Sequence, residues 1–131
     1  MHYFAIVHQD EDSAFGVQFP DVPGCFSAAD AEDDILTNAI EALALHLEGA
    51  SAPQARTLAE VRSDPDVRGH LEDGAFLIAV PLVRLSGRSA KANITMDAGL
   101  LEAVDATARR RKLTRSAYLA DLARRDIAGR L

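Results

Sequence analysis

Hydrophobic and polar residues alternate strictly in one short segment near the C-terminal end of the chain. In residues 91–96, Lys, Asn and Thr take the odd positions, and Ala, Ile and Met take the even ones. A period of two places the two kinds of side chain on opposite faces of a β-strand. Because a lone strand leaves its backbone hydrogen-bonding groups unpaired, we expect this strand to pair with the same strand of a second chain.

Two segments with helical periodicity follow this strand. Asp97 and Thr114 are residue types favoured at helix N-caps, and apolar residues recur every three or four positions after each of them. We therefore expect two helices with a tight turn between them. The apolar positions are Leu100, Leu101, Val104 and Ala108 in the first helix, and Tyr118, Leu119, Leu122, Ala123 and Ile127 in the second.

Residues 89–128 resemble the ribbon-helix-helix (β-α-α) family of DNA-binding proteins. The resemblance implies a homodimer through residues 91–128, in which two strands form an antiparallel ribbon. Such a ribbon fits the DNA major groove, so Lys91, Asn93 and Thr95 are the candidate base-reading residues. The alternative is that these side chains form an ordinary exposed strand face. The chain departs from the family at Lys112, where glycine is common, and a left-handed backbone at a non-glycine residue costs about 1 kcal/mol.

Contacts with DNA phosphates are expected at the ends of the two helices. The first backbone N–H groups of the second helix have no acceptor within the helix, so Thr114, Arg115 and Ser116 are candidates. Arg110 is a further candidate, within the basic run at residues 109–112. That run fits a solvated helix end equally well, because cations are favourable at a helix C-terminus.

The first half of the chain alternates strand and turn patterns. The expected strands are residues 3–8, 14–19, 25–29 and 75–83. Between the third and fourth strands we expect a helix with an N-cap at Asp30 and a stop at Gly49. Thr57 is expected to cap a second, shorter helix. This order predicts an α+β domain whose helices lie on one face of a small antiparallel sheet.

Charge divides the chain in the same way. Residues 1–87 hold 4 basic and 15 acidic side chains, a net charge of −11, whereas residues 88–131 hold 10 basic and 5 acidic ones, a net charge of +5. We therefore expect a domain at residues 1–85, a linker at 86–90 and a second domain at 91–131. The basic end can bind DNA, and the acidic end suits a basic protein partner, although both could be merely solvated surfaces.

Several classes of protein are disfavoured by what the chain contains. Cys25 is the single cysteine, so an intrachain disulfide framework is excluded. The apolar runs are shorter than the roughly 20 residues that cross a bilayer. The N-terminal residues do not have the pattern of a signal peptide. We expect a cytoplasmic protein without a membrane partner.

The segment from Phe19 to Cys25 (FPDVPGC), with the acidic start of an alanine-rich helix after it, resembles the HicB antitoxin family. Together with the C-terminal segment, this resemblance spans nearly the whole chain. It implies a truncated, RNase H-like N-terminal domain that binds HicA, a small mRNA-cleaving toxin, and a C-terminal domain that represses the operon by binding operator double-stranded DNA. It further implies that the chain is not an enzyme and needs no cofactor. A dimer is expected, and a tetramer stays open.

The residues that face the toxin are predicted from charge alone. A ribonuclease needs a basic surface to hold RNA phosphates, so acidic loops are the expected contact points. The accessible candidates are Asp10, Glu11 and Asp12 in the first hairpin loop and Asp21 in the proline-rich turn.

Two other functions remain as alternatives. The first is a stand-alone ribbon-helix-helix regulator without a toxin, which the neighbouring reading frame would distinguish. The second is a metal-dependent nuclease, which requires several carboxylates converging on two metal ions. Asp10, Glu11 and Asp12 are consecutive, so their side chains diverge, and the four histidines match no metal-ligand spacing. We therefore expect neither a catalytic residue nor a metal site.

Overall fold

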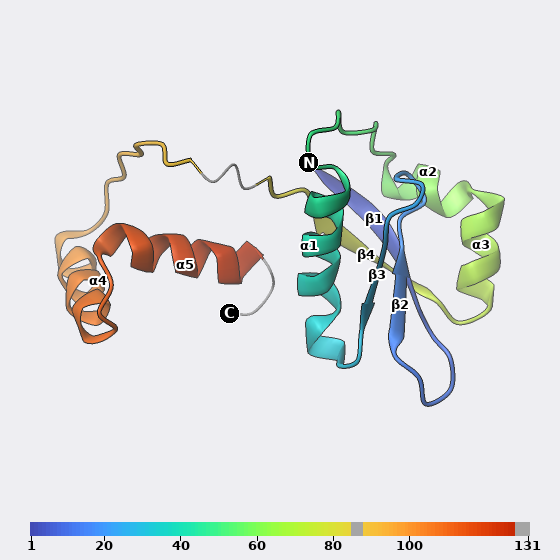
Figure 1. Ribbon diagram of the computed structural model, residues 1–131, viewed down its shortest axis with the longest axis horizontal. Coiled ribbons are helices and arrows are strands. Elements are labelled where there is room, and N and C mark those ends of the chain that lie inside the picture. The colour runs from blue at the N-terminus through green and yellow to red at the C-terminus, as the bar shows by residue number, and fades with distance from the viewer. Residues whose placement is uncertain (85–87, 128–131) are drawn as a thin grey trace. The chain divides into compact units, whose positions relative to one another are not determined.

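The computed structural model describes residues 1–84 and 88–127 (Figure 1). The chain divides into two compact units, Met1–Leu85 and Ser86–Leu131, which are described separately below. The first two residues of the expected linker lie outside the described residues, as do positions 128–131. Of the helices in residues 1–84 and 88–127, none combines the length and the apolar character that spanning a bilayer requires.

The N-terminal unit is built on a four-stranded antiparallel sheet (Figure 1). Its strands are β1 (His2–Gln9), β2 (Phe15–Gln18), β3 (Phe26–Ala29) and β4 (Phe76–Pro81), in the spatial order β3-β2-β1-β4. The first three strands form a meander, and β4 returns to the free side of β1. The expected α+β fold with a small antiparallel sheet is therefore confirmed.

Helix α1 (Ile35–His46) covers one face of this sheet. It follows a 3₁₀ turn at Glu32–Asp34, and its residues Ala39 and Leu43 are fully buried against Tyr3 and Val7 of β1. The Tyr3 hydroxyl donates a hydrogen bond to the backbone carbonyl of Pro53. The bond fastens the loop after α1 to the first strand.

Helices α2 (Leu58–Ser63) and α3 (Pro65–Glu72) lie on the opposite face, where Ile6 packs with Val61 and Val67. The expectation that the helices share one face is therefore wrong for these two helices. The physical reason lies in β1. Phe4 and Ile6 are apolar, and they alternate along the strand with the apolar residues that contact α1. A strand with apolar residues on both faces needs cover on both faces.

The short helices begin at capped residues. Thr57 forms a capping box with Glu60, in which the Glu60 N–H donates to the Thr57 Oγ1 at 3.2 Å and the Thr57 N–H donates to the Glu60 Oε1 at 3.1 Å. The expected cap at Thr57 is thus confirmed. The expected cap at Asp30 is wrong, because Ala31 precedes the 3₁₀ turn without a side-chain cap bond.

The C-terminal unit contains helices α4 (Ala98–Arg110) and α5 (Arg115–Ile127). The Leu100 N–H donates to the Asp97 Oδ2 at 3.0 Å, and the Ala117 N–H donates to the Thr114 Oγ1 at 3.1 Å. Lys112, between the helices, has a φ of 58°. The two N-caps and the left-handed turn residue are therefore confirmed.

Residues 91–96 form no strand in the single chain. Ile94, on the apolar side of the expected strand, is 63% exposed. Only Val104 and Ala108 of α4 are buried among the described residues of this unit, and α5 contributes no buried residue. The pairing of this segment with a second chain stays a prediction, and the exposed apolar residues are those that such a pairing would cover.

Candidate functional site

A groove lies on the α2–α3 side of the sheet, between α3 and the segment that joins β2 to β3. We call it the α3 groove. It has a volume of about 390 Å³. Residues that line it include Ile6, Gln18, Pro23, Phe26, Asp66 and His70. Apolar side chains and the polar Gln18 of β2 line the groove on the side of the sheet, and Asp66 and His70 line it on the side of α3.

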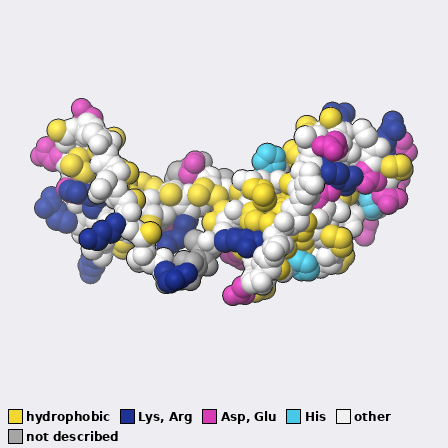
Figure 2. Space-filling model, turned by 90° about the horizontal axis from the view of Figure 1, so that it is seen from above, with side chains coloured by type: hydrophobic (Ala, Val, Ile, Leu, Met, Phe, Trp, Pro, Cys, Tyr) yellow, Lys and Arg dark blue, Asp and Glu magenta, His cyan; other side chains and the backbone are white. Residues whose placement is uncertain are grey.

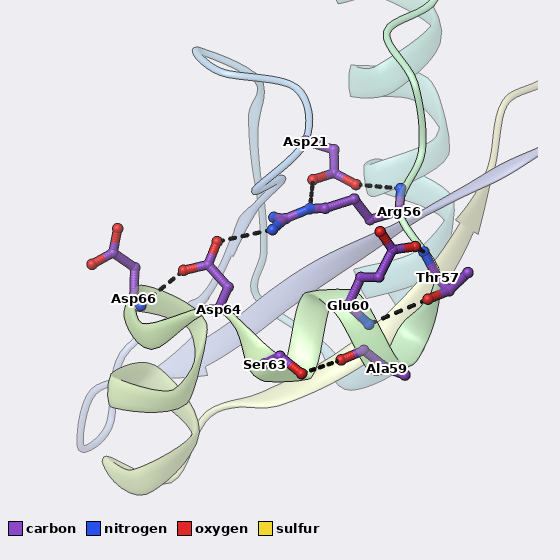
Figure 3. A network of polar contacts seen from close by, with 8 residues as sticks. All are labelled: Asp21, Arg56, Thr57, Ala59, Glu60, Ser63, Asp64 and Asp66. Carbon is purple, nitrogen blue, oxygen red and sulfur yellow. Dashed lines mark hydrogen bonds and ion pairs between the residues drawn. The ribbon is translucent and has the colours of Figure 1, made fainter.

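An ion-pair network holds the start of α3 beside the proline-rich turn (Figure 3). The Arg56 Nε donates to the Asp21 Oδ1 at 2.6 Å, and the Arg56 backbone N–H donates to the Asp21 Oδ2 at 2.8 Å. The same guanidinium donates to the Asp64 Oδ2 at 3.1 Å. Asp64 is the N-cap of α3 and accepts from the Asp66 N–H at 2.9 Å. One arginine therefore joins two segments that are far apart in the sequence.

The charges in this network stabilise one another. Hydrogen bonds from Arg56 and from the Asp66 backbone N–H lower the pKa of Asp64 below its ordinary value. Hydrogen bonds to Asp21 and then to Asp64 raise the pKa of Arg56 above its ordinary value. These bonds favour the charged forms of both residues, and Arg56 offsets part of the negative charge that Asp64 brings to the groove.

Asp21 is a positioning residue in this geometry. Its side chain is only 7% exposed, and both of its oxygens accept from Arg56. Among the four acidic residues suggested as toxin contacts, Asp21 therefore has little surface to offer a partner. Asp10, Glu11 and Asp12 lie in the exposed loop between β1 and β2, with Asp12 in a left-handed conformation.

A second polar contact ties α3 to the sheet. The Gln18 Nε2 lies 3.0 Å from the His70 Nε2, and the ring of His70 stacks on that of His8 with 6.4 Å between centroids. The His8 ring lies over Gly16, where a Cβ atom would come within 2.6 Å of the His8 Nε2. The absence of a side chain at Gly16 thus leaves room for the His8 ring.

Phe26 is the most exposed aromatic residue of the described sheet, at 67%. It lies on β3, an edge strand, opposite Gln18 of β2. Helices α2 and α3 cover the face near β1 but leave Phe26 uncovered. An exposed aromatic residue beside a groove is typical of a binding surface.

The candidate DNA-binding residues lie on the C-terminal unit. Lys91, Asn93 and Thr95 are all exposed. Figure 2 shows dark-blue Lys and Arg side chains gathered on this unit. The single chain does not bring the three candidate base-reading side chains into an ordered strand.

The candidate phosphate contacts include residues that are already engaged. The Arg115 Nε and Nη2 donate to the two oxygens of Asp105, each at 2.8 Å, so a forked ion pair joins α5 to α4. Thr114 accepts from the Ala117 N–H, and Arg110 donates to the Thr107 Oγ1 at 3.1 Å. The backbone N–H groups of Arg115 and Ser116 are the first of α5 and suit an anion.

Metal binding and nuclease chemistry would both require several ligand side chains to converge. Within residues 1–84 and 88–127, no three His, Cys, Asp or Glu side chains are grouped so that they could hold a metal ion. The consecutive carboxylates of the hairpin loop are not joined by Asp21, which is turned toward Arg56.

Four residues of the site were not expected from the sequence: Arg56, Asp64, Phe26 and His70. Arg56 and Asp21 are 35 positions apart, and His70 and Gln18 are 52 positions apart. The tertiary structure alone brings these pairs together. Phe26 gave the one local signal, because it is the single large apolar residue of the expected strand at 25–29. A residue of this size is usually buried, so its place in a short strand pointed to a contact surface.

Comparison with known proteins defines the class of this chain. Residues 3–123 match the family model described as the HicB-like antitoxin of bacterial toxin–antitoxin systems. The chain therefore belongs to the HicB-like antitoxin family.

Individual relatives agree with this classification. An uncharacterised 14.9 kDa protein from the rep–hol intergenic region of Haemophilus phage HP1 (strain HP1c1) is 32% identical over 107 residues, which cover 78% of each chain. The crystal structure of the Burkholderia pseudomallei antitoxin HicB superposes with a TM-score of 0.56 at 28% identity, covering 97% of this chain and 98% of that one. A chain of the HicA3 and HicB3 toxin–antitoxin complex superposes with a TM-score of 0.52 at 30% identity, covering 63% of this chain and 99% of that one.

Proposed function

We propose that this protein is the antitoxin of a type II toxin–antitoxin pair and acts in the cytoplasm without enzymatic activity. Residues 1–85 bind and neutralise a HicA-type, mRNA-cleaving toxin. Residues 91–131 form a homodimer that binds operator DNA and represses the operon, and residues 86–90 link the two parts. The observation that carries this proposal is the division into two compact units of opposite net charge.

The toxin partner is supported by family and by charge. The HicA3 and HicB3 complex is a toxin bound to a relative of this chain. A toxin that cleaves mRNA needs a basic surface for RNA phosphates, and the N-terminal unit is strongly acidic. Opposite potentials steer such partners together and raise the association rate. We propose that Asp10, Glu11 and Asp12 contribute to this attraction from their exposed loop.

DNA binding is supported by the residue types at the C-terminal end. In a ribbon formed by two chains, Lys91, Asn93 and Thr95 would occupy one face, and Ile94 would face the helices. The exposure of Ile94 and the absence of buried residues in α5 support a dimer, because a second chain supplies the missing cover. Phosphates would contact Arg110, the cap at Thr114, and the backbone N–H groups of Arg115 and Ser116.

The neutralising function is tested by an RNA-cleavage assay. The toxin encoded beside this chain's gene is incubated with RNA and increasing amounts of the full-length protein. We expect cleavage to stop near equimolar protein, because a stable complex removes the toxin's RNA-binding surface. If the toxin stays fully active at excess full-length protein, or if no toxin gene lies nearby, the stand-alone regulator becomes the better proposal.

The DNA-binding function is tested with two substitutions in the full-length protein. Asn93→Ala should weaken binding to operator DNA by about 1–3 kcal/mol while changing binding to scrambled DNA much less, because a base contact discriminates sequences. Arg110→Ala should weaken binding to both and reduce its salt dependence, because a phosphate contact is independent of sequence. Equal losses on both DNAs for Asn93→Ala would contradict base reading by that residue.

A further inference from the structure

We propose that the α3 groove is the docking site for a basic side chain of the toxin, a Lys or Arg flanked by an apolar residue. The inference rests on the proposed toxin-binding function and assigns a surface to it. The apolar flank would cover Phe26, and the cationic head would face Asp66 on the rim. This site differs from the acidic hairpin loop, which is too exposed and too polar to anchor a partner by burial.

Phe26 supplies the apolar part of the argument. Phe26 leaves 67% of its surface in water, so a partner that covers it removes a large apolar area from water, which favours binding. Pro23, which is itself exposed, continues the apolar surface into the groove. Binding energy in protein interfaces concentrates at such aromatic residues next to pockets.

Charge selects the kind of side chain that fits. Of the described residues that line the groove, none is Lys or Arg, whereas Asp64 and Asp66 contribute carboxylates. Asp64 is held by Arg56, but Asp66 is exposed, and its backbone N–H rather than its carboxylate takes part in the capping bond. The unit as a whole carries a net charge of −11. A cation is therefore attracted to the groove, and a nucleic acid is repelled from it.

An aromatic ring beside a carboxylate suits a long basic side chain in a further way. The apolar stem of Lys or Arg packs on apolar surface while its charged end reaches a polar group. The positive end also interacts favourably with the face of an aromatic ring. The combination of Phe26 and Asp66 offers both contacts within one groove.

The groove is pre-formed, which favours binding. Arg56 holds the proline-rich turn and α3 together, and the Gln18–His70 contact of 3.0 Å joins α3 to β2. Because both walls are fixed before the partner arrives, less conformational entropy is lost on association. These contacts form in the free chain, so the groove beside the exposed Phe26 is present before a partner binds.

The first test compares two substitutions of phenylalanine in the full-length protein. Phe26→Ser should weaken binding to the purified product of the neighbouring toxin gene by about tenfold or more, a loss typical of a central aromatic contact. Phe76→Ser is the matched control. Phe76 lies on β4 at the opposite edge of the sheet and is 45% exposed. We expect it to leave toxin affinity within about twofold of the wild type, provided that circular dichroism shows both variants folded.

The second test compares two charge reversals. Asp66→Lys should slow association with the toxin by about tenfold at low salt, and the difference should shrink as salt rises. Glu32→Lys is the control, because Glu32 is also an exposed acidic residue in the first turn of a helix and changes the net charge equally. Slower association in Asp66→Lys alone supports the groove as the docking site. Equal slowing in both variants indicates general attraction and overturns the specific site.

The outcomes separate this inference from the function on which it rests. If wild-type protein does not bind the toxin, the proposed function fails. If wild-type protein binds the toxin and both groove variants behave like their controls, the function stands and the groove is not the site. If Phe26→Ser changes the oligomeric state of the protein in the absence of toxin, measured by light scattering, the groove is occupied by a second copy and the inference is overturned.

Discussion

Arg56 is the residue on which the groove wall depends most directly. It donates to Asp21 from both its side chain and its backbone, and it reaches Asp64 as well (Figure 3). Removing its side chain would leave Asp21, with only 7% of its own side chain exposed, without the guanidinium. A buried acceptor without its partner is unfavourable because water cannot replace the lost hydrogen bonds.

We therefore predict that Arg56→Ala lowers the free energy of unfolding of the N-terminal unit by about 1–3 kcal/mol. Arg62→Ala, at an exposed position of α2, should change it by less than about 0.5 kcal/mol. Urea denaturation followed by circular dichroism measures both. Equal stability of the two variants would show that Arg56 is not needed to hold the turn and α3 together.

The same network predicts how stability depends on pH. The pKa of Asp64 is lowered chiefly by Arg56, and the pKa of Glu60 is lowered by its bonds with Thr57. When folding lowers the pKa of a carboxyl, the unfolded state binds the proton more tightly than the folded state does, so protonation favours unfolding. Its contribution to stability is therefore present above about pH 4 and is lost as the pH falls through the lowered value.

The thermal midpoint of unfolding should accordingly decrease as the pH is lowered from about 5 to about 3. In Arg56→Ala the fall over the same range should be smaller, because the main cause of the lowered Asp64 pKa is gone. Thermal denaturation at constant ionic strength tests this. A steeper fall in the variant than in the wild type would contradict the assigned role of Arg56.

At the scale of elements, three of the four expected N-caps were predicted correctly, whereas the cap at Asp30 and the placement of α2 and α3 were not. Thr57, Asp97 and Thr114 act on backbone N–H groups within three positions, so the local sequence contains the whole interaction. The side of the sheet on which α2 and α3 pack depends instead on the apolar residues of β1. Because β1 carries apolar residues on both faces, both faces need cover, which an arrangement with all helices on one face does not provide.

The candidate site, too, has parts that could be predicted from local sequence and parts that depend on contacts between distant residues. The acidic hairpin loop and the proline-rich turn were recognised from the residue types in a short segment. The Arg56–Asp21 pair and the Gln18–His70 contact could not be predicted, since each requires the folded arrangement of separate elements. Asp21 was consequently assigned to a partner surface although its side chain faces inward.

The turn between α4 and α5 offers a prediction at this scale. Lys112 has a φ of 58°, where a residue with a Cβ atom is strained by about 1 kcal/mol. Lys112→Gly removes that strain but gives the unfolded chain more freedom. We expect a net stabilisation of less than about 1 kcal/mol, since the second effect offsets part of the first.

Lys112→Val is the contrasting variant, because a β-branched residue is disfavoured in this conformation and should lower stability. Both are compared with the wild type by urea denaturation at one protein concentration, since dimer formation makes the midpoint depend on concentration. If Val is tolerated as well as Gly, the left-handed conformation at this position is not maintained in solution.

At the scale of the whole molecule, the two units differ in how much of their stability is their own. The N-terminal unit has two hydrophobic cores, one on each face of its sheet. The C-terminal unit buries only Val104 and Ala108 among its described residues. We therefore expect the second unit to depend on association, whereas the first folds without it.

Ile94→Asp should convert the full-length protein from a dimer to a monomer at micromolar concentration. An aspartate at this position would be buried against the helices of the expected dimer, where a charge is strongly disfavoured. Leu45→Asp, at a position of α1 that is 72% exposed, is the control and should leave the dimer intact. Analytical ultracentrifugation distinguishes the two states, and a wild-type protein that is monomeric throughout would contradict the ribbon-helix-helix dimer.

The buried cysteine gives the molecule a chemical reporter of its own folding. Cys25 is the single cysteine of the chain, it is 2% exposed, and burial raises the pKa of its thiol. A thiol reagent reacts with the exposed thiolate, so in the native protein both the access and the reactive form are suppressed. Cys25 lines the α3 groove, so labelling requires the structure around the groove to open, and the labelling rate measures how often local or global opening happens. A partner bound in the groove would slow the same reaction, so the labelling rate of Cys25 reports both opening of the structure and binding of a partner.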